Sequence, residues 1–184
     1  MASRARLLRA ADSILVLVDL QDRLLQAMAG AVTARAVLLA RAAELLDVPV
    51  IATRQNPTAL GALAPELIAV LPKTTPIWDK TAFSCTDVPG LMGFVMASGR
   101  KQLVLAGVET HVCILQSAFG FLDSGFGVAV VTDAVASRKE ADRVAALGRM
   151  TQAGIAQATV ESVVFEWLRN AAHPQFRAVL ALVK

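Results

Sequence analysis

Three residues of chemically useful types, Asp19, Lys80 and Cys113, each lie at or just after the end of a short apolar run. An ionised cysteine is a nucleophile, a carboxylate can accept and return its proton, and a lysine can stabilise either anion. The carboxyl ends of parallel strands meet at one edge of a sheet, where α/β proteins place their ligands. These three side chains are therefore candidates for a shared active site.

Cys113 is the most informative of the three. Thr110 is placed to cap a helix over 110–124, which puts Cys113 in its first turn, where backbone amides lack partners and the helix dipole is positive. That position, with Lys80 nearby, predicts a lowered thiol pKa and an oxyanion site formed by the same amides. On position alone, a buried and inert thiol is the more common outcome.

Asp19 and Lys80 also have ordinary interpretations, as a carboxylate that caps a loop and a solvated surface lysine. Asp19 could instead act as general base and then general acid, with Lys80 keeping it ionised. If the sheet changes direction between its first and fourth strands, Asp19 and Cys113 face each other across the crevice. The convergence of three side chains favours catalysis more than any one of them does.

Other chemistries find little support in the sequence. His111, two positions before Cys113, points to a different helical face and is expected at the surface or a pocket rim. His173 and Cys85 are not placed by any motif, and two histidines with two cysteines at these spacings form no metal-ligand cluster. No glycine-rich phosphate loop follows the first strand. We expect neither a metal nor a cofactor.

Short apolar runs alternate with longer amphipathic segments along the chain. This pattern predicts right-handed βαβ units in one domain over 1–184: a doubly wound, three-layer, Rossmann-like α/β fold with helices on both faces of a parallel sheet. The predicted strands are 14–18, 49–53, 75–78, 102–106, 127–132 and 154–156, and the predicted helices are 32–46, 88–98, 110–124, 138–152, 159–170 and 175–183.

Composition limits the possible partners. The chain has 184 residues, 55% of them hydrophobic and 18% charged, with a net charge of +3. The longest stretch without a charged residue, 110–122, is too short to span a membrane. The basic residues are spread along the chain and do not form the clustered patch typical of a nucleic-acid-binding surface. Two cysteines favour a reducing compartment, so we expect a cytoplasmic protein. The basic segment with Arg4, Arg6 and Arg9 is interpreted as a short leading helix.

Aromatic side chains on the later helices could form either the core or a subunit contact. The candidates are Phe119, Phe121, Phe126, Phe165 and Trp167. Core packing is the default for any one of them. The high apolar content is explained by a parallel sheet buried on both faces together with a subunit interface.

Three sequence blocks, in this order, resemble the isochorismatase-like cysteine hydrolases, which include nicotinamidases and N-carbamoylsarcosine amidases. The blocks are 17–21 (LVDLQ), 80–84 (KTAFS) and 107–113 (GVETHVC), and the similarity extends over nearly the whole chain. The resemblance implies that Asp19, Lys80 and Cys113 form a catalytic triad. It also implies a cis peptide bond between Val108 and Glu109, which directs the Glu109 amide, with that of Cys113, into an oxyanion hole.

The resemblance further implies a mechanism in which Asp19 deprotonates Cys113 and the thiolate forms a thioacyl intermediate that water releases. It also implies oligomerisation, which is common in the family. Segment 53–57 (TRQNP) lacks the Asp-x-His metal ligands of nicotinamidases and looks closer to uncharacterised isochorismatase-domain hydrolases. Gln55, Phe83 and Thr110 are expected to line the substrate pocket.

The sequence therefore predicts a metal-independent cysteine hydrolase that acts on a small amide or a related acyl compound. Two alternatives remain open. One is a redox-responsive thiol protein that uses Cys113 without hydrolysis, and the other is a catalytically silent interaction module on the same scaffold.

Overall fold

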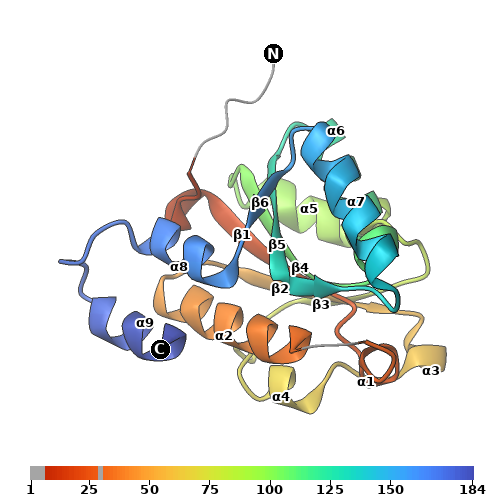
Figure 1. Cartoon of the computed structure of the whole chain (residues 1–184), viewed down its shortest axis with the longest axis horizontal. Coiled ribbons are helices and arrows are strands. Elements are labelled where there is room, and N and C mark those ends of the chain that lie inside the picture. Colours follow the sequence, from red (N-terminus) through yellow and green to blue (C-terminus); the bar gives the residue numbers. More distant parts are fainter. Residues whose placement is uncertain (1–6, 29–30) are drawn as a thin grey trace.

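A six-stranded parallel sheet of order β3-β2-β1-β4-β5-β6 forms the centre of the molecule (Figure 1). The computed structural model describes residues 7–28 and 31–184. The strands are β1 (Ser13–Val18), β2 (Val50–Gln55), β3 (Ile77–Lys80), β4 (Gln102–Val108), β5 (Gly127–Ala136) and β6 (Ala156–Ala158). The sheet confirms the predicted α/β class.

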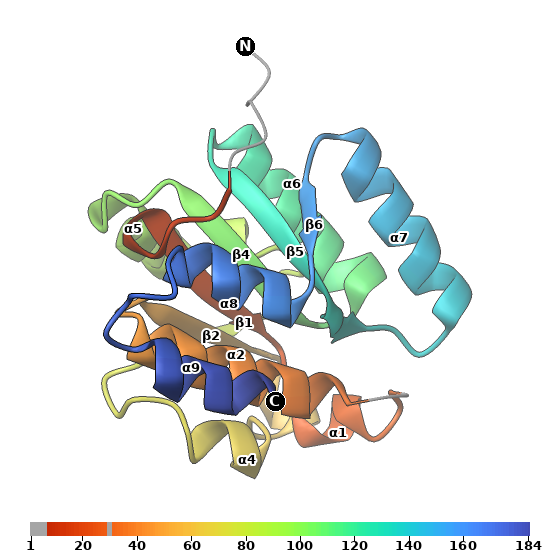
Figure 2. The ribbon, with the colours of Figure 1, turned by 60° about the vertical axis from the view of Figure 1, so that its left-hand side comes forward.

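Helices cover both faces of this sheet (Figure 2). The α-helices are α1 (Asp22–Leu25), α2 (Val32–Leu45), α3 (Pro57–Leu60), α4 (Pro65–Ile68), α5 (Pro89–Ala97), α6 (Leu115–Asp123), α7 (Glu140–Gln152), α8 (Val160–Leu168) and α9 (Phe176–Val183). The 3-10 turns are η1 (Ala10–Asp12) and η2 (Cys85–Asp87), and η3 (Thr110–Ile114) is a π-helical turn. Helices α2, α8 and α9 pack on one face, and α5, α6 and α7 on the other.

Strand β1 shows why the sheet is buried on both faces. All six of its residues are buried, and successive side chains of a strand point to opposite faces. Ile14, Val16 and Val18 enter the core beneath α5 and α6, whereas Leu15 and Leu17 enter the core beneath α2 and α8. A continuous apolar run is the pattern expected of such a strand.

The sheet reverses its strand order at β1, which lies between β2 and β4. Asp19 directly follows β1, Lys80 ends β3, and the chain leaving β4 enters the turn that carries Cys113. The change of direction between the first and fourth strands, which was the condition for a crevice shared by Asp19 and Cys113, is met. It brings the carboxyl ends of these strands to one edge of the molecule.

The structure corrects several local predictions. The helix expected over 110–124 is divided into η3 and α6, and its N-cap is Glu109 rather than Thr110. The expected leading helix falls partly on residues 1–6, outside the described residues, and the part that is described contains the short 3-10 turn η1. Short helices α1, α3 and α4 were not predicted, because each has too few residues to show a helical period.

Three of the five aromatic residues considered for subunit contacts belong to the core. Phe121, Phe126 and Trp167 are buried, whereas Phe165 is 38% exposed. Within the described residues, no helix is both long and apolar enough to cross a membrane.

Gly107 lets β4 approach β1 closely near the candidate site. Its φ is +130°, and an added Cβ would lie 2.8 Å from the carbonyl carbon of Val18 and still closer to the carbonyl oxygen. Any side chain here would force the two central strands apart, because the obstructing atoms are backbone atoms.

We expect Gly107→Ala to lower the free energy of unfolding by about 3 kcal/mol or more, through this clash and the unfavourable φ. Gly148→Ala in α7 is the matched control, because an added Cβ there meets nothing within 4 Å. It should be neutral or stabilise by up to about 1 kcal/mol. Urea denaturation of both variants measures the difference, and equal stabilities would contradict this account of β4 packing.

Candidate active site

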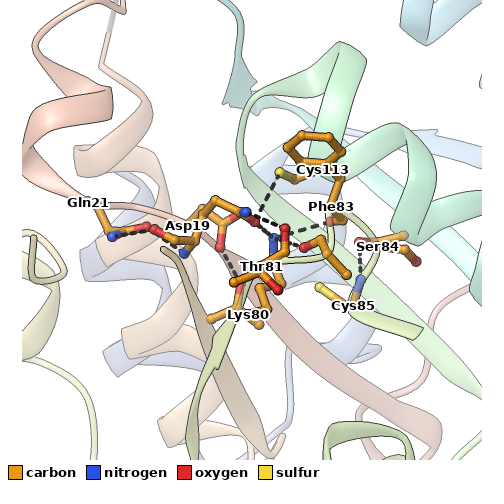
Figure 3. A network of polar contacts seen from close by, with 12 residues as sticks. Asp19, Gln21, Lys80, Thr81, Phe83, Ser84, Cys85 and Cys113 are labelled. Carbon is orange, nitrogen blue, oxygen red and sulfur yellow. Dashed lines mark hydrogen bonds and ion pairs between the residues drawn. The ribbon is translucent and has the colours of Figure 1, made fainter. Parts of the chain in front are cut away.

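Asp19 lies at the carboxyl end of β1 with its side chain fully buried (Figure 3). Its φ of +53° is in the left-handed region, which aspartate tolerates better than most residues. Oδ1 accepts a hydrogen bond of 2.8 Å from Thr53 Oγ1, and Oδ2 lies 2.7 Å from Lys80 Nζ. The carboxylate is therefore held at both oxygens, by one residue of β2 and one of β3.

Lys80 ends β3, and its ammonium group is also buried, with only 1% of the side chain exposed. Besides Asp19, the Nζ atom donates to Gln55 Oε1 at 2.6 Å and to the carbonyl oxygens of Ala82 and Phe83 at 3.3 and 3.2 Å. A buried charge is tolerated only when it is paired and hydrogen-bonded, and both conditions hold here. The alternative interpretation of Lys80 as a solvated surface lysine is thus contradicted.

Cys113 lies beside this pair, with 6% of its surface exposed. Its Sγ is 4.0 Å from Gln55 Oε1, at the outer limit for a thiol hydrogen bond. The pKa of the Cys113 thiol is raised to about 12: burial contributes most, the Asp19 carboxylate also raises it, and Lys80 lowers it. The predicted lowering of this pKa is wrong, because desolvation and Asp19 outweigh Lys80. In the free protein Cys113 is a thiol near neutral pH.

The backbone around Cys113 departs from an ordinary helix start. In η3 the Glu109 carbonyl accepts from the amide of Ile114 at 3.2 Å, five residues later, and from the amide of Val112 at 3.1 Å. Turns of this π type occur often at functional sites, and hydrophobic periodicity does not distinguish them from α-helix.

The residues that precede η3 are also fixed. The peptide bond between Val108 and Glu109 is cis, the isomer that the resemblance implies for this position. Glu109 Oε2 accepts hydrogen bonds of 3.1 Å from both the backbone amide and the Nε of Arg138, in the segment after β5. The loop after β5 thus anchors the start of the turn that carries Cys113.

Two glutamines extend the network: Gln55, which the sequence predicts as a pocket residue, and Gln21, which it does not. Gln55 ends β2, and its Nε2 donates to the Thr81 carbonyl at 2.8 Å. Gln21, which is fully buried, accepts from the Gln55 amide at 2.7 Å and donates to the Gln55 carbonyl at 3.1 Å. Apart from its place in the block 17–21, nothing in the sequence singled out Gln21.

The residues expected to line a pocket occupy different environments. Phe83 is 49% exposed, next to the segment that binds Lys80. Thr110 is fully buried, and its Oγ1 has no hydrogen-bond partner among the described residues. A cavity of about 540 Å³ lies elsewhere, between the start of α2 and the segment after β5. Arg138 lines this cavity, whereas Asp19, Lys80 and Cys113 do not.

His111 lies away from the candidate site, whereas Cys85 borders the Asp19–Lys80 pair on the side of Thr53. His111 Nδ1 lies 3.0 Å from Ser137 Oγ and its Nε2 lies 3.9 Å from Asp142, so the ring faces α7 rather than Cys113. The Cys85 amide donates to Ser117 Oγ at 2.9 Å, and burial raises the pKa of the Cys85 thiol to about 11. The part of the chain described contains no group of three or more His, Cys, Asp or Glu that could bind a metal ion.

The chain is similar to several known proteins along most of its length. It is 40% identical over 178 residues to mouse isochorismatase domain-containing protein 2A, covering 94% of this chain and 83% of the relative. It matches the structure described as the MAR1 ribonuclease of Caenorhabditis elegans with a TM-score of 0.91 and 34% identity, over 96% of this chain and 91% of the other.

A second solved structure is the YcaC gene product of Escherichia coli, described as an octameric hydrolase of unknown specificity. It superimposes with a TM-score of 0.89 and 32% identity, over 97% of this chain and 89% of the other. The model of the isochorismatase domain matches residues 13–162, a region that contains every side chain of the candidate site. The chain therefore belongs to the isochorismatase domain family.

Proposed function

We propose that this protein is a metal-independent cysteine hydrolase that cleaves a small amide or a related acyl compound. The observation that carries the proposal is the buried Asp19–Lys80 pair beside the thiol of Cys113. Membership of the isochorismatase domain family supports hydrolysis, as does the similarity to a protein described as a hydrolase.

In the proposed mechanism Asp19 removes the proton from Cys113 as Sγ attacks the substrate carbonyl carbon. The negative charge moves from Asp19 to sulfur and then to the carbonyl oxygen, so the net charge of the site does not change. Lys80 stays next to the negative charge throughout, which limits the cost of moving charge in a buried site. A preformed thiolate is not required.

The tetrahedral intermediate then collapses to a thioester. We assign its oxyanion to the backbone amides of Glu109 and Cys113, at the positions that the family resemblance implies. The carbon–nitrogen bond breaks, and the proton held by Asp19 passes to the leaving amine. Water next attacks the thioester, with Asp19 as its base, and the products are the free acid and the Cys113 thiol.

The raised pKa of Cys113 predicts how the free protein reacts with iodoacetamide. Because only the thiolate is alkylated, labelling of Cys113 should accelerate about tenfold per pH unit from pH 7 to pH 10, without reaching a plateau. Cys85 is completely buried and should label more slowly. Peptide mass spectrometry measures both rates. A plateau near neutral pH would show a thiolate in the free protein and contradict this description.

A substrate panel tests the hydrolase itself. Cys113→Ser should reduce turnover of any amide that the wild type hydrolyses by at least about a thousandfold, because the hydroxyl is a far weaker nucleophile in this site. Cys85→Ser is the matched control and should retain activity if it remains folded. Full activity in Cys113→Ser would refute the mechanism. RNA belongs in the panel, because one similar structure is described as a ribonuclease; RNA cleavage independent of Cys113 would favour that function instead.

We also propose that the protein forms a homo-oligomer. Helix α5 carries no charged residue. Met96 on this helix is 63% exposed, Ile77 on the edge strand β3 is 44% exposed, and Phe83 is 49% exposed. Exposed apolar side chains on a charge-free element are typical of subunit contacts. The similar E. coli protein is described as octameric.

Light scattering tests this assembly. At micromolar concentration we expect a particle whose mass is a multiple of 19.4 kDa, and Met96→Lys should shift it towards smaller species by placing a charge in the apolar surface. A monomer of 19.4 kDa under these conditions would refute the proposal.

A further inference from the structure

We propose that Gln55 is a positioning residue whose side-chain oxygen holds the Lys80 ammonium group next to Cys113. This inference rests on the proposed function and gives Gln55 a role that a pocket wall does not have. The contact of 2.6 Å from Lys80 Nζ to Gln55 Oε1 is one of the two short contacts that the ammonium group makes, the other being with Asp19 at 2.7 Å.

The orientation of the Gln55 side-chain amide is determined by its neighbours. Its nitrogen donates to the Thr81 carbonyl at 2.8 Å, and its oxygen faces the ammonium group. In the reverse orientation the side-chain nitrogen of Gln55 would face the Lys80 ammonium group, which is also a donor. The side-chain oxygen of Gln55 would then face the backbone carbonyl oxygen of Thr81, which is also an acceptor. The oxygen of Gln55 is thus presented to Lys80 in a single orientation.

The backbone of Gln55 is fixed as firmly as its side chain. Gln21 forms hydrogen bonds with both the amide and the carbonyl of Gln55, and it also donates to the Gly61 carbonyl at 2.8 Å. Gln55 is the register partner of Lys80 in the parallel pair of β2 and β3. Both ends of the contact therefore belong to adjacent strands rather than to mobile loops.

The proposed mechanism needs such a contact at one moment in particular. When Asp19 accepts the proton of Cys113, its carboxyl group becomes neutral and its attraction for Lys80 weakens. The remaining acceptors of the ammonium group are Gln55 Oε1 at 2.6 Å and the carbonyls of residues 82 and 83 at 3.2–3.3 Å. Gln55 supplies the shortest of these contacts and keeps Lys80 beside the newly formed thiolate.

Gln55 also lies 4.0 Å from Cys113 Sγ, so removing it affects two contacts. A charge-assisted bond at 2.6 Å is much stronger than a thiol contact at 4.0 Å, because the thiol is a weak donor. The loss of the Lys80 contact should therefore determine how a substitution of Gln55 changes the pKa of Cys113. Lys80 lowers the pKa of Cys113, so a loosened Lys80 lets that pKa rise.

The first test compares iodoacetamide labelling of Cys113 in the full-length wild type and in Gln55→Met, which keeps the side-chain length but has no strong acceptor. We expect the rising part of the labelling profile to shift by about one pH unit towards higher pH, so that labelling at each pH slows about tenfold. Gln157→Met is the control, because the Gln157 amide binds the Leu147 carbonyl away from the site, and it should leave the profile unchanged. An unmoved limb in a folded Gln55→Met variant would overturn the inference.

The second test asks whether Gln55 acts through Lys80. In a Lys80→Met background, Gln55→Met should change the labelling rate less than twofold, because the ammonium group that it positions is gone. If Lys80→Met alone does not fold, the background is instead the double variant Asp19→Asn with Lys80→Met, because these two substitutions together remove both buried charges. An equal tenfold loss with and without Lys80 would show that Gln55 acts independently and would overturn the proposal.

These results are distinguishable from a failure of the proposed function. Turnover that survives Cys113→Ser refutes the hydrolase mechanism whatever the labelling of Gln55→Met shows. Unchanged labelling in Gln55→Met refutes only the role of Gln55, because the triad is intact in that variant.

Discussion

The arrangement of the candidate site depends on the buried ion pair between Asp19 and Lys80. Removing two charges from water costs several kcal/mol for each ion, so the pair is tolerated only with nearly complete hydrogen bonding. Thr53, Gln55 and the carbonyls after Lys80 supply that bonding. Asp19 directly follows β1, Lys80 ends β3, and Thr53 and Gln55 belong to β2, so the ion pair and its partners tie the ends of three strands together. Burial and, after it, the Asp19 carboxylate of this pair keep the Cys113 thiol protonated until a substrate is attacked.

The scaffold explains why this pair forms where it does. The double-sided burial of β1 fixes the position of Asp19, and the parallel register of β2 and β3 sets Gln55 opposite Lys80. The close approach of β4 to β1 at Gly107 then brings the following turn, with Cys113, to the same edge. The site is thus built from strand ends rather than from long loops, which favours a preorganised geometry.

Much of this was predictable from the sequence, and the failures have identifiable physical causes. The apolar run at β1 predicts a strand buried on both faces, and the alternation of elements predicts a parallel sheet whose strand ends, with Asp19 and Cys113, lie at one edge. The strand order that creates the switch point was not predicted, because no local pattern encodes which strands pair. The π-helical turn was not predictable, because it differs from an α-helix by a shift in backbone hydrogen bonds and not in apolar spacing.

The pKa of Cys113 was predicted in the wrong direction for a related reason. A position in a helical sequence indicates the local dipole, but the degree of burial and the proximity of Asp19 depend on how separate segments pack. The roles of Gln21 and Thr53 also depend on how separate segments of the chain pack together. Both are polar residues whose partners lie more than thirty positions away, so no local pattern marks them.

The central claim is that Cys113 accepts an acyl group with the help of the Asp19–Lys80 pair. The most direct measurement is intact-protein and peptide mass spectrometry after brief exposure to p-nitrophenyl acetate at neutral pH. We expect one acetyl group per chain, located on Cys113, that forms at least about tenfold more slowly in Asp19→Asn. An acetyl group on other residues only, or acetylation of Cys113 at an equal rate in Asp19→Asn, would contradict it.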